Sequence, residues 1–202
     1  MSKLFVISAP SGAGKTSLVR ALLQRRGQLV VSVSHTTRRP RAHENDGQDY
    51  HFVTIERFET LVQQGAFLEH ARVFDNYYGT GARQVQERLA AGFDVILEID
   101  WQGASQVRSA MPDCVSIFIL PPSREALARR LRERRTDSPE VIERRLRDAV
   151  DDMRHYLEFD YVVINDRFEQ AVDDLEAIVA GRGAALRADR PALAAFVQAL
   201  LH

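Results

Sequence analysis

The stretch APSGAGKTS, residues 9–17, decides how the rest of the sequence is interpreted. An apolar run, LFVI at residues 4–7, precedes it, and apolar residues follow it at helical spacing from Leu18 to Leu23. A buried strand that passes through a loop of small residues into a helix is the opening unit of many α/β folds. The stretch therefore predicts a strand, a tight loop and a helix at the start of the fold.

The loop itself matches most of the P-loop pattern G-x-x-x-x-G-K-[ST], with Ala9 in place of the first glycine. Glycines let backbone N–H groups turn toward phosphate oxygens, and a helix N-terminus adds N–H donors and the positive end of its dipole. The alternative is a glycine-rich turn without a ligand, but the strand and helix around it favour a phosphate-binding site. The expected site comprises Ala9, Pro10, Ser11, Gly12, Ala13, Gly14, Lys15, Thr16 and Ser17. In such loops the lysine contacts the β- and γ-phosphates, and the threonine hydroxyl is placed to bind Mg²⁺.

The use of basic residues singles out the same lysine. Of 27 Lys and Arg residues, only Lys3 and Lys15 are lysine. A lysine in this loop could be due to chance. The functional explanation is that the loop needs a compact ammonium group that a planar guanidinium cannot replace.

Composition restricts the remaining possibilities. With 45% hydrophobic and 27% charged residues, the chain has the composition of a soluble globular protein. Its net charge of −1 does not favour nucleic acid or a membrane surface as a partner, and its apolar runs are too short to span a bilayer. The single cysteine, Cys114, excludes an intrachain disulfide. We expect a cytoplasmic protein without a signal peptide; the sequence leaves open whether it forms a homo-oligomer.

Alternating strand and helix patterns predict a parallel sheet flanked by helices. Strands are expected at residues 4–8, 29–33, 95–99, 115–120 and 161–164, and helices at about 15–26, 83–91, 102–110 and 191–201. Two segments interrupt this alternation. Residues 34–81 have the pattern of a small mixed sheet with a helix at 55–64, and the arginine-rich residues 123–150 have the pattern of two helices capped at Ser123 and Ser138.

Arginines and a tyrosine gather after the second strand. In SVSHTTRRPRAHENDGQDYHF, residues 32–52, Arg38, Arg39, Arg41 and Tyr50 could bind a phosphate through guanidinium forks and a hydroxyl. The alternative is a solvated turn beside Pro40.

Further along, Glu69 is a candidate for recognition of a base, and Asp100 is a candidate for contact with the metal or the substrate. Guanine presents two adjacent donors, N1–H and the N2 amine, which one carboxylate can accept together, whereas adenine would leave that carboxylate buried and unpaired. Asp100 follows an apolar strand, where α/β folds place ligand-binding residues. Taken alone, Glu69 could equally be a surface acid.

Together these segments resemble the guanylate kinases of the bacterial type. The resemblance runs from about Leu4 to Asp166 and is carried by APSGAGKTS, SVSHTTRRPR, FLEHARVFDNYYGT, ILEIDWQG and IFILPPS in this order and spacing. It implies transfer of the γ-phosphoryl group of ATP to GMP. It also implies a P-loop core at residues 1–33, 82–122 and 144–202, a GMP-binding region at 34–81 and a lid at 123–143. No residue singled out reads the 2′-hydroxyl, so dGMP is an expected second acceptor.

The resemblance also implies roles for individual residues. Lys15 would contact the transferring phosphate and Thr16 the magnesium ion, and Asn165 would line the adenine side. The GMP phosphate would be held by Arg38, Arg41, Tyr50 and Tyr78, and the guanine end by Ser34, Glu69, Gly79, Thr80 and Asp100. From the lid, Arg130, Arg134 and Arg145 would close over the phosphates.

The sequence departs from the family pattern at three places: Ala9 in the loop, Glu98 where an aspartate is usual, and Arg135 where a small residue is usual.

The sequence leaves two other functions open. A scaffold module that binds phosphorylated peptides would not need the intact loop, Lys15 and the lid arginines. A kinase of the same fold with another acceptor would not need Glu69 beside Ser34 and NYYGT. A GTPase is disfavoured because no N-K-x-D-like motif is present.

Overall fold

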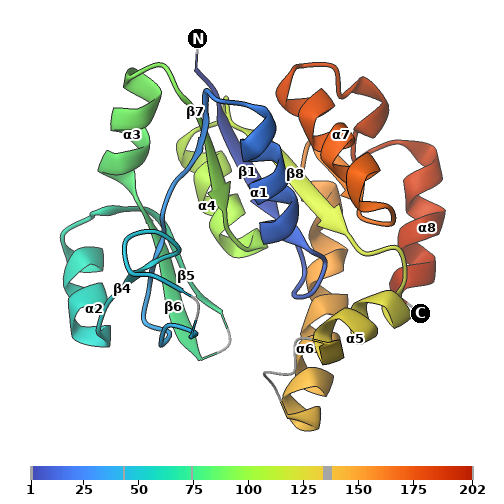
Figure 1. The fold of residues 1–202 in the computed structure, drawn as a ribbon, viewed down its shortest axis with the longest axis horizontal. Coiled ribbons are helices and arrows are strands. Elements are labelled where there is room, and N and C mark those ends of the chain that lie inside the picture. The colour runs from blue at the N-terminus through green and yellow to red at the C-terminus, as the bar shows by residue number, and fades with distance from the viewer. Residues whose placement is uncertain (1, 43, 74, 134–137, 202) are drawn as a thin grey trace. The chain divides into compact units, whose positions relative to one another are not determined.

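Two sheets organise the chain (Figure 1). The computed structural model describes residues 2–42, 44–73, 75–133 and 138–201. The larger sheet has the order β2-β7-β1-β8-β9. Its strands are β1 (Leu4–Ser8), β2 (Leu29–Val31), β7 (Asp94–Glu98), β8 (Val115–Leu120) and β9 (Tyr161–Ile164). The β2–β7 and β8–β9 pairs are parallel, and the predicted α/β fold with a five-stranded sheet is confirmed.

The strands of this sheet are buried because their sequences are apolar on both faces. Every residue of β1 is buried, and β8 is buried from Ser116 onward. Contacts within the chain define two compact units, one of residues 1–6 and 27–115 and the other of residues 7–26 and 116–202. Each unit is described below by itself.

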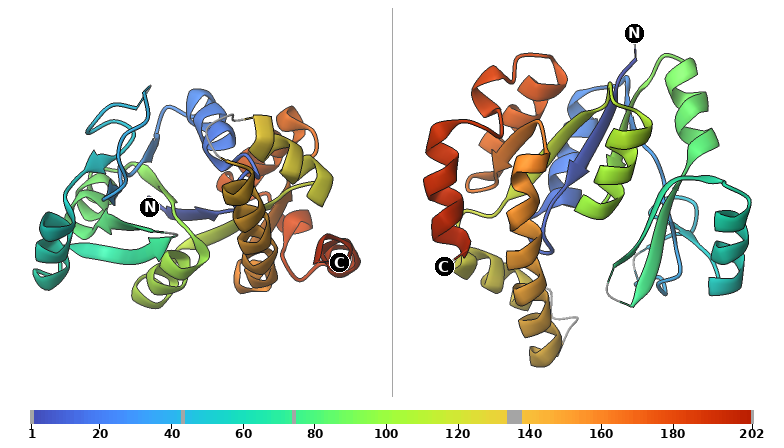
Figure 2. Two further views of the ribbon diagram at one scale, coloured as in Figure 1. Left: turned by 90° about the horizontal axis from the view of Figure 1, so that it is seen from below. Right: turned by 180° about the vertical axis from the view of Figure 1, so that it is seen from behind.

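In the unit of residues 7–26 and 116–202, α1 (Lys15–Arg25) packs against α7 (Phe168–Val179), and Arg25 pairs with Glu169 at 2.9 Å. The expected helical pair is present as α5 (Arg124–Glu133) and α6 (Pro139–Met153), which share a core of Leu127, Leu131 and Ala149. The predicted caps are confirmed, because Ser123 accepts from the N–H of Ala126 and Ser138 from that of Val141. The last helix, α8 (Pro191–Leu201), packs alongside α6 (Figure 2), and short 3₁₀ turns occupy Arg154–Glu158 and Ala184–Leu186.

The unit of residues 1–6 and 27–115 contains the smaller sheet, with strand order β4-β3-β6-β5. Its strands are β3 (His35–Thr36), β4 (His51–Phe52), β5 (Phe67–Val73) and β6 (Asn76–Gly81). The helices of this unit are α2 (Ile55–Gln63), α3 (Ala82–Ala90) and α4 (Trp101–Ala110). Phe58 of α2 is buried against Phe67 and Tyr77, with ring centroids 4.8 and 5.5 Å away, and this aromatic core holds α2 on the sheet.

Besides shifts of one residue, such as β7 at 94–98 instead of 95–99, three details differ from the prediction. The strand expected at 29–33 ends at Val31; one further ladder bond follows, from Ser32 N–H to the Ile96 carbonyl, before the chain leaves for β3. Strand β3, of two residues, has no apolar run that could have revealed it. Helix α7 was not predicted, although its buried Ala171, Leu175 and Ile178 recur at helical spacing.

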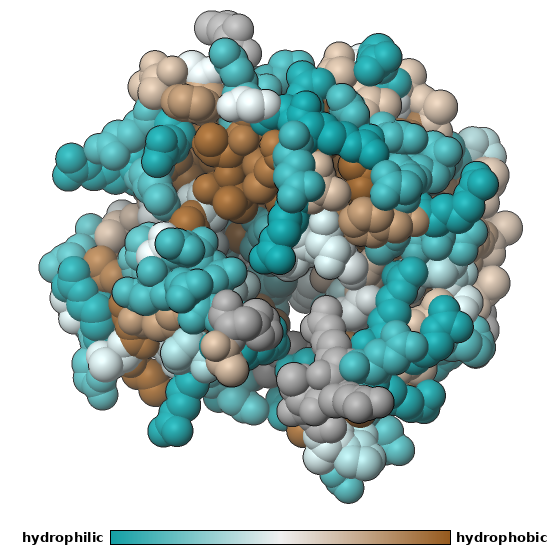
Figure 3. All heavy atoms as spheres, in the orientation of Figure 1, coloured by the Kyte–Doolittle hydropathy of each residue, from teal (hydrophilic) through white to brown (hydrophobic). Residues whose placement is uncertain are grey.

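None of the described helices is long and apolar enough to cross a membrane. Hydrophilic side chains predominate on the face of the molecule in Figure 3. The thiol of Cys114 is buried just before β8.

Candidate active site

The loop between β1 and α1 is shaped by two glycines with left-handed backbone angles. Gly12 has φ 92° and Gly14 has φ 97°, and the N–H of Ala13 donates to the Pro10 carbonyl at 3.1 Å. Gly14 is the N-cap of α1, whose described residues offer neither a side-chain cap nor an acid in the first turn. The first-turn N–H groups and the positive end of the dipole are therefore suited to an external anion.

Side chains from other elements of the same unit hold this loop in place through hydrogen bonds. Asn165 directly follows β9, is 5% exposed, and donates from Nδ2 to the Ala13 carbonyl at 2.7 Å. Arg130 of α5 donates to the Ala13 and Asn165 carbonyls at 3.4 and 2.9 Å. A Cβ atom on Gly14 would lie 2.4 Å from Asn165 Nδ2, so this position needs glycine both for its φ angle and for space.

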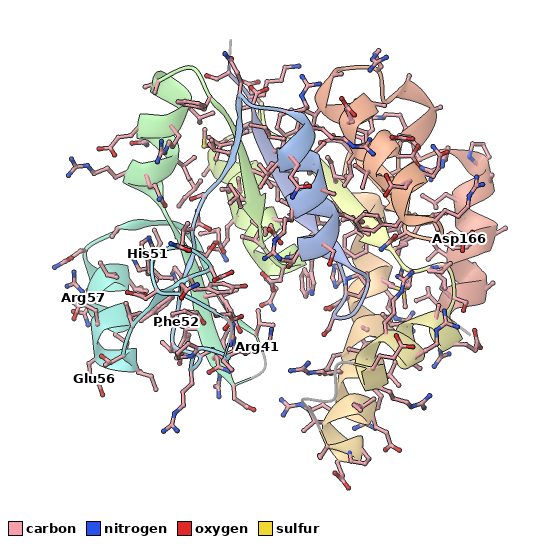
Figure 4. All side chains as sticks on the ribbon, in the orientation of Figure 1. Arg41, His51, Phe52, Glu56, Arg57 and Asp166 are labelled. Atoms are coloured by element: carbon pink, nitrogen blue, oxygen red, sulfur yellow. The ribbon has the colours of Figure 1, made fainter. Side chains whose placement is uncertain are left out.

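Beside the loop lies a cavity of about 410 Å³, a volume within the range of small-molecule sites. Apolar Phe168 and charged Arg130 both contribute to it, and Asp166, labelled in Figure 4, follows Asn165 in the chain. Its lining consists of Gly12, Gly14, Ser17, Arg130, Glu133, Asn165, Asp166 and Phe168. Lys15 and Thr16 open α1, with Lys15 half-buried and Thr16 exposed.

In the other unit, three predicted residues form a buried hydrogen-bonded chain. Glu69 is 2% exposed, Thr80 is fully buried and Ser34 is 8% exposed. Thr80 Oγ1 donates to Glu69 Oε1 at 2.6 Å, and Ser34 Oγ lies 3.3 Å from Thr80 Oγ1. Since a hydroxyl has one proton and Thr80 gives it to the carboxylate, Ser34 is the donor in the second bond.

The pairing of β5 with β6 builds this chain. Glu69 lies directly opposite Thr80 in the antiparallel ladder, after an irregularity between Phe67 and Glu69. Tyr78 lies two residues before Thr80 and therefore on the same face of β6, whereas a Cβ on Gly79 would meet the rings of Phe58 and Phe67 at 3.1 Å. The smaller sheet thus has a polar face and an aromatic face that packs against α2.

The first turn of α4 leaves room for the Glu69 carboxylate because residue 103 is glycine. A Cβ at Gly103 would lie 2.3 Å from Glu69 Oε2. Asp100, the N-cap of α4, accepts from the Gly103 N–H at 3.0 Å. The structure therefore brings Asp100 and Glu69 to the same end of α4.

The residues expected at the acceptor phosphate also cluster. The Arg38 guanidinium lies over the Tyr50 ring, 5.4 Å from its centroid, and the Tyr50 and Tyr78 rings are 6.0 Å apart. Burial, followed by the nearby Tyr78, raises the pKa of Tyr50 to about 12, so this hydroxyl keeps its proton at neutral pH. Burial works to lower the pKa of Arg38, but the hydrogen bond to Glu44, the charge of Glu44 and the nearby Tyr78 together raise it.

Two residues of these clusters escaped the sequence analysis. Glu44 contacts Arg38 at 2.8 Å and Arg41 at 3.7 Å, and the only available signal was an acid three residues after an arginine. Gly103 could not be found, because its importance depends on an approach by Glu69 from another element. Of the predicted lid residues, Arg145 is half-buried on α6, while Arg134, like Arg135, lies outside the described residues. Arg39 is exposed.

Comparisons with known proteins point the same way as these clusters. The family model described as guanylate kinase matches residues 1–181. The chain is 57% identical to a guanylate kinase of Alkalilimnicola ehrlichii over 198 residues, which cover 98% of each chain. It is 62% identical to a guanylate kinase of Chromohalobacter salexigens over 176 residues, 87% of this chain and 82% of the other. Among solved structures, the guanylate kinase from Anaplasma phagocytophilum matches with a TM-score of 0.76 at 34% identity, over 91% of this chain and 87% of that one. The chain therefore belongs to the guanylate kinase family.

Proposed function

We infer that this chain is an ATP:GMP phosphotransferase, which transfers the γ-phosphoryl group of ATP to GMP and yields ADP and GDP. Family membership supports the reaction, and one structural observation carries the choice of acceptor. That observation is the carboxylate of Glu69, which is buried, fixed at Oε1 by Thr80 and accommodated at Oε2 by Gly103.

A buried carboxylate of this kind selects guanine because guanine presents hydrogen-bond donors to it and adenine does not. It accepts from the guanine N1–H and N2 amine, and Asp100 is a second acceptor at the same helix end. Adenine offers an acceptor at N1 and no donor at C2, so its binding would leave a buried charge unsatisfied. Ser34 and Thr80 complete the guanine end, with Gly79 keeping the strand close to its aromatic support.

The phosphate of GMP is the nucleophile, and the protein supplies charge and position rather than a base. Arg38 and Arg41 bind its oxygens, and the hydroxyls of Tyr50 and Tyr78 donate to it. Because this phosphate already carries the attacking oxygen, we assign no general base.

The donor nucleotide binds at the loop of residues 9–17, with its phosphates on the first-turn N–H groups of α1 and its base toward Asn165. Lys15 neutralises charge that develops on the transferring phosphoryl group. No described group of three or more His, Cys, Asp and Glu residues could hold a metal ion. The Thr16 hydroxyl would hold Mg²⁺, and the ion would neutralise charge on the phosphates of ATP.

Residues 123–143 serve as the lid and residues 34–81 as the GMP-binding region. Arg130, Arg134 and Arg145 stabilise the transferring group when both nucleotides are bound. Closure also excludes water, which would otherwise accept the phosphoryl group and hydrolyse ATP.

The test is ADP production from ATP and Mg²⁺ with GMP, dGMP, AMP, CMP, UMP or no acceptor. We expect turnover with GMP and dGMP, and at least about a thousandfold lower kcat/KM with AMP, in keeping with a site that hydrogen-bonds its substrate. Turnover with another acceptor would retain the loop assignment and refute the guanine site. Binding of GMP without turnover would favour a binding module instead.

A further inference from the structure

Glu44 joins the two arginines of the acceptor-phosphate cluster. Its Oε1 lies 2.8 Å from Arg38 Nη2 and 3.7 Å from Arg41 Nη1. Its Oε2 accepts from the backbone N–H of Arg41 at 2.8 Å. One carboxylate therefore contacts both guanidinium groups and the backbone that carries one of them; Figure 4 labels Arg41 on this loop.

The carboxylate is held firmly by its own loop. The N–H of Glu44 donates to the Arg41 carbonyl at 3.0 Å, which closes a turn between the two residues. The Glu44 side chain is only 8% exposed. Burial alone would raise its pKa, but the hydrogen bonds from Arg38 and the Arg41 backbone, together with the charges of both arginines, lower the pKa, so the group stays ionised at neutral pH.

Arg38 is fixed on one edge and open on another. One Nη2 hydrogen goes to Glu44, and Nη1 donates to the Arg39 carbonyl at 2.8 Å. The guanidinium plane is further held over the rings of Tyr50 and Phe52, at 5.4 and 5.8 Å from their centroids. A guanidinium has five N–H donors, so a fork fixed in this way still has donors for a phosphate.

We propose that Glu44 is a positioning residue that orients the guanidinium groups of Arg38 and Arg41 for the phosphate of the acceptor nucleotide, an inference that rests on the proposed function. It aligns the arginines before the substrate arrives, so that binding loses less side-chain freedom. The competing idea is that Glu44 occupies the phosphate site and leaves when GMP binds. The bonds of Oε2 and of the Glu44 N–H to the Arg41 backbone favour the positioning role, because they make the carboxylate part of the loop.

The test compares the wild type with Glu44→Ala, Glu44→Gln and the control Glu59→Gln, an exposed acid on α2 of the same unit. KM for GMP, KM for ATP and kcat are measured, together with the melting temperature and the dissociation constant of guanosine, which has no phosphate. We expect Glu44→Ala to raise KM for GMP about tenfold or more, as loss of an orienting partner typically does, with kcat less affected. The Gln variant should fall between the Ala variant and the wild type, because its amide oxygen can still accept from the Arg41 N–H.

KM for ATP, guanosine binding and the Glu59→Gln variant should stay within twofold of the wild type. A lower KM for GMP in either Glu44 variant would overturn the proposal and identify Glu44 as a competitor of the phosphate. Equal weakening of guanosine and GMP, or an unchanged KM for GMP, would also overturn it. Wild-type protein that fails to phosphorylate GMP would refute the proposed function itself, which is a separate outcome.

Discussion

The loop of residues 9–17 and the smaller sheet are suited to their expected ligands by different kinds of group. The loop offers backbone N–H donors, and its neighbouring side chains, Asn165 and Arg130, bind loop carbonyls. The sheet instead offers side chains, with Glu69, Thr80 and Ser34 buried in one hydrogen-bonded chain.

The difference matches what each ligand demands. Phosphate is a symmetric anion, so a ring of N–H donors and one cation binds it without reference to the base attached. Guanine must be distinguished from adenine, and only a buried, directional acceptor makes the wrong base costly. Substitutions in the loop should therefore abolish turnover with every acceptor, whereas substitutions in the sheet should change which acceptor is used.

The largest effect is expected at Lys15. Lys15→Ala removes the one ammonium group of the loop and should lower kcat/KM about a thousandfold with GMP and dGMP alike, because charge on the transferring phosphoryl group loses its partner. Lys15→Arg should restore little, since a planar guanidinium cannot replace the ammonium. ADP production measures both. The exposed Arg20→Ala on α1 is the control, and near-normal turnover in Lys15→Ala would contradict the loop assignment.

Next comes Glu69→Gln, which keeps the shape of the side chain and places an NH₂ group where guanine needs an acceptor. Turnover with GMP should fall at least about a hundredfold in kcat/KM, while the low rate with AMP should change little, so that selectivity collapses. Rates with both acceptors, measured beside the Glu59→Gln control, test this. An unchanged ratio of GMP to AMP turnover would show that Glu69 does not read the base.

Gly103→Ala should lower kcat/KM with GMP less than Glu69→Gln does. The added methyl group would lie 2.3 Å from Glu69 Oε2 and must displace a carboxylate that Thr80 holds in place. We expect KM for GMP to rise about tenfold, with KM for ATP unchanged. Gly27→Ala is the matched control, because nothing lies within 4 Å of a Cβ there. If both variants bind GMP equally well, Glu69 does not depend on the space at Gly103.

The contrast between the loop and the smaller sheet also explains which features could be predicted from the sequence. The loop was predictable because its glycines and the start of α1 belong to consecutive residues, so that spacing alone specifies the geometry. The strands at 4–8, 115–120 and 161–164 were predicted to the residue because buried parallel strands are apolar on both faces. The sheet site depends on strand pairing, and Glu69 could be selected only through the resemblance to a family. Gly103 acts through the approach of Glu69 from another element, which no local pattern records, and Glu44 gave only the weak signal of an acid three residues after an arginine.

The smallest expected effect is a pH dependence confined to the smaller sheet. His35 of β3 stacks on His51 of β4 with ring centroids 4.7 Å apart, and its buried Nδ1 has no hydrogen-bond partner among the described residues. Burial, followed by repulsion from His51 and Arg57, lowers the pKa of His35 below its ordinary value of 6.5. Figure 4 shows His51 and Arg57 in this region.

The sign follows from the proton balance. Above pH 6.5 His35 is neutral in both the folded and the unfolded chain, so it adds no pH dependence. As the pH falls below 6.5, the unfolded chain gains a proton that the folded chain resists, and the free energy of unfolding decreases until the folded pKa is reached. We expect urea unfolding at pH 7.5 and 5.5 to show a smaller loss of stability in His35→Gln than in the wild type, with exposed His70→Gln as the control. An equal loss of unfolding free energy in all three proteins would mean that acid acts on groups other than His35. The smaller sheet would then be no more sensitive to pH than the loop of residues 9–17.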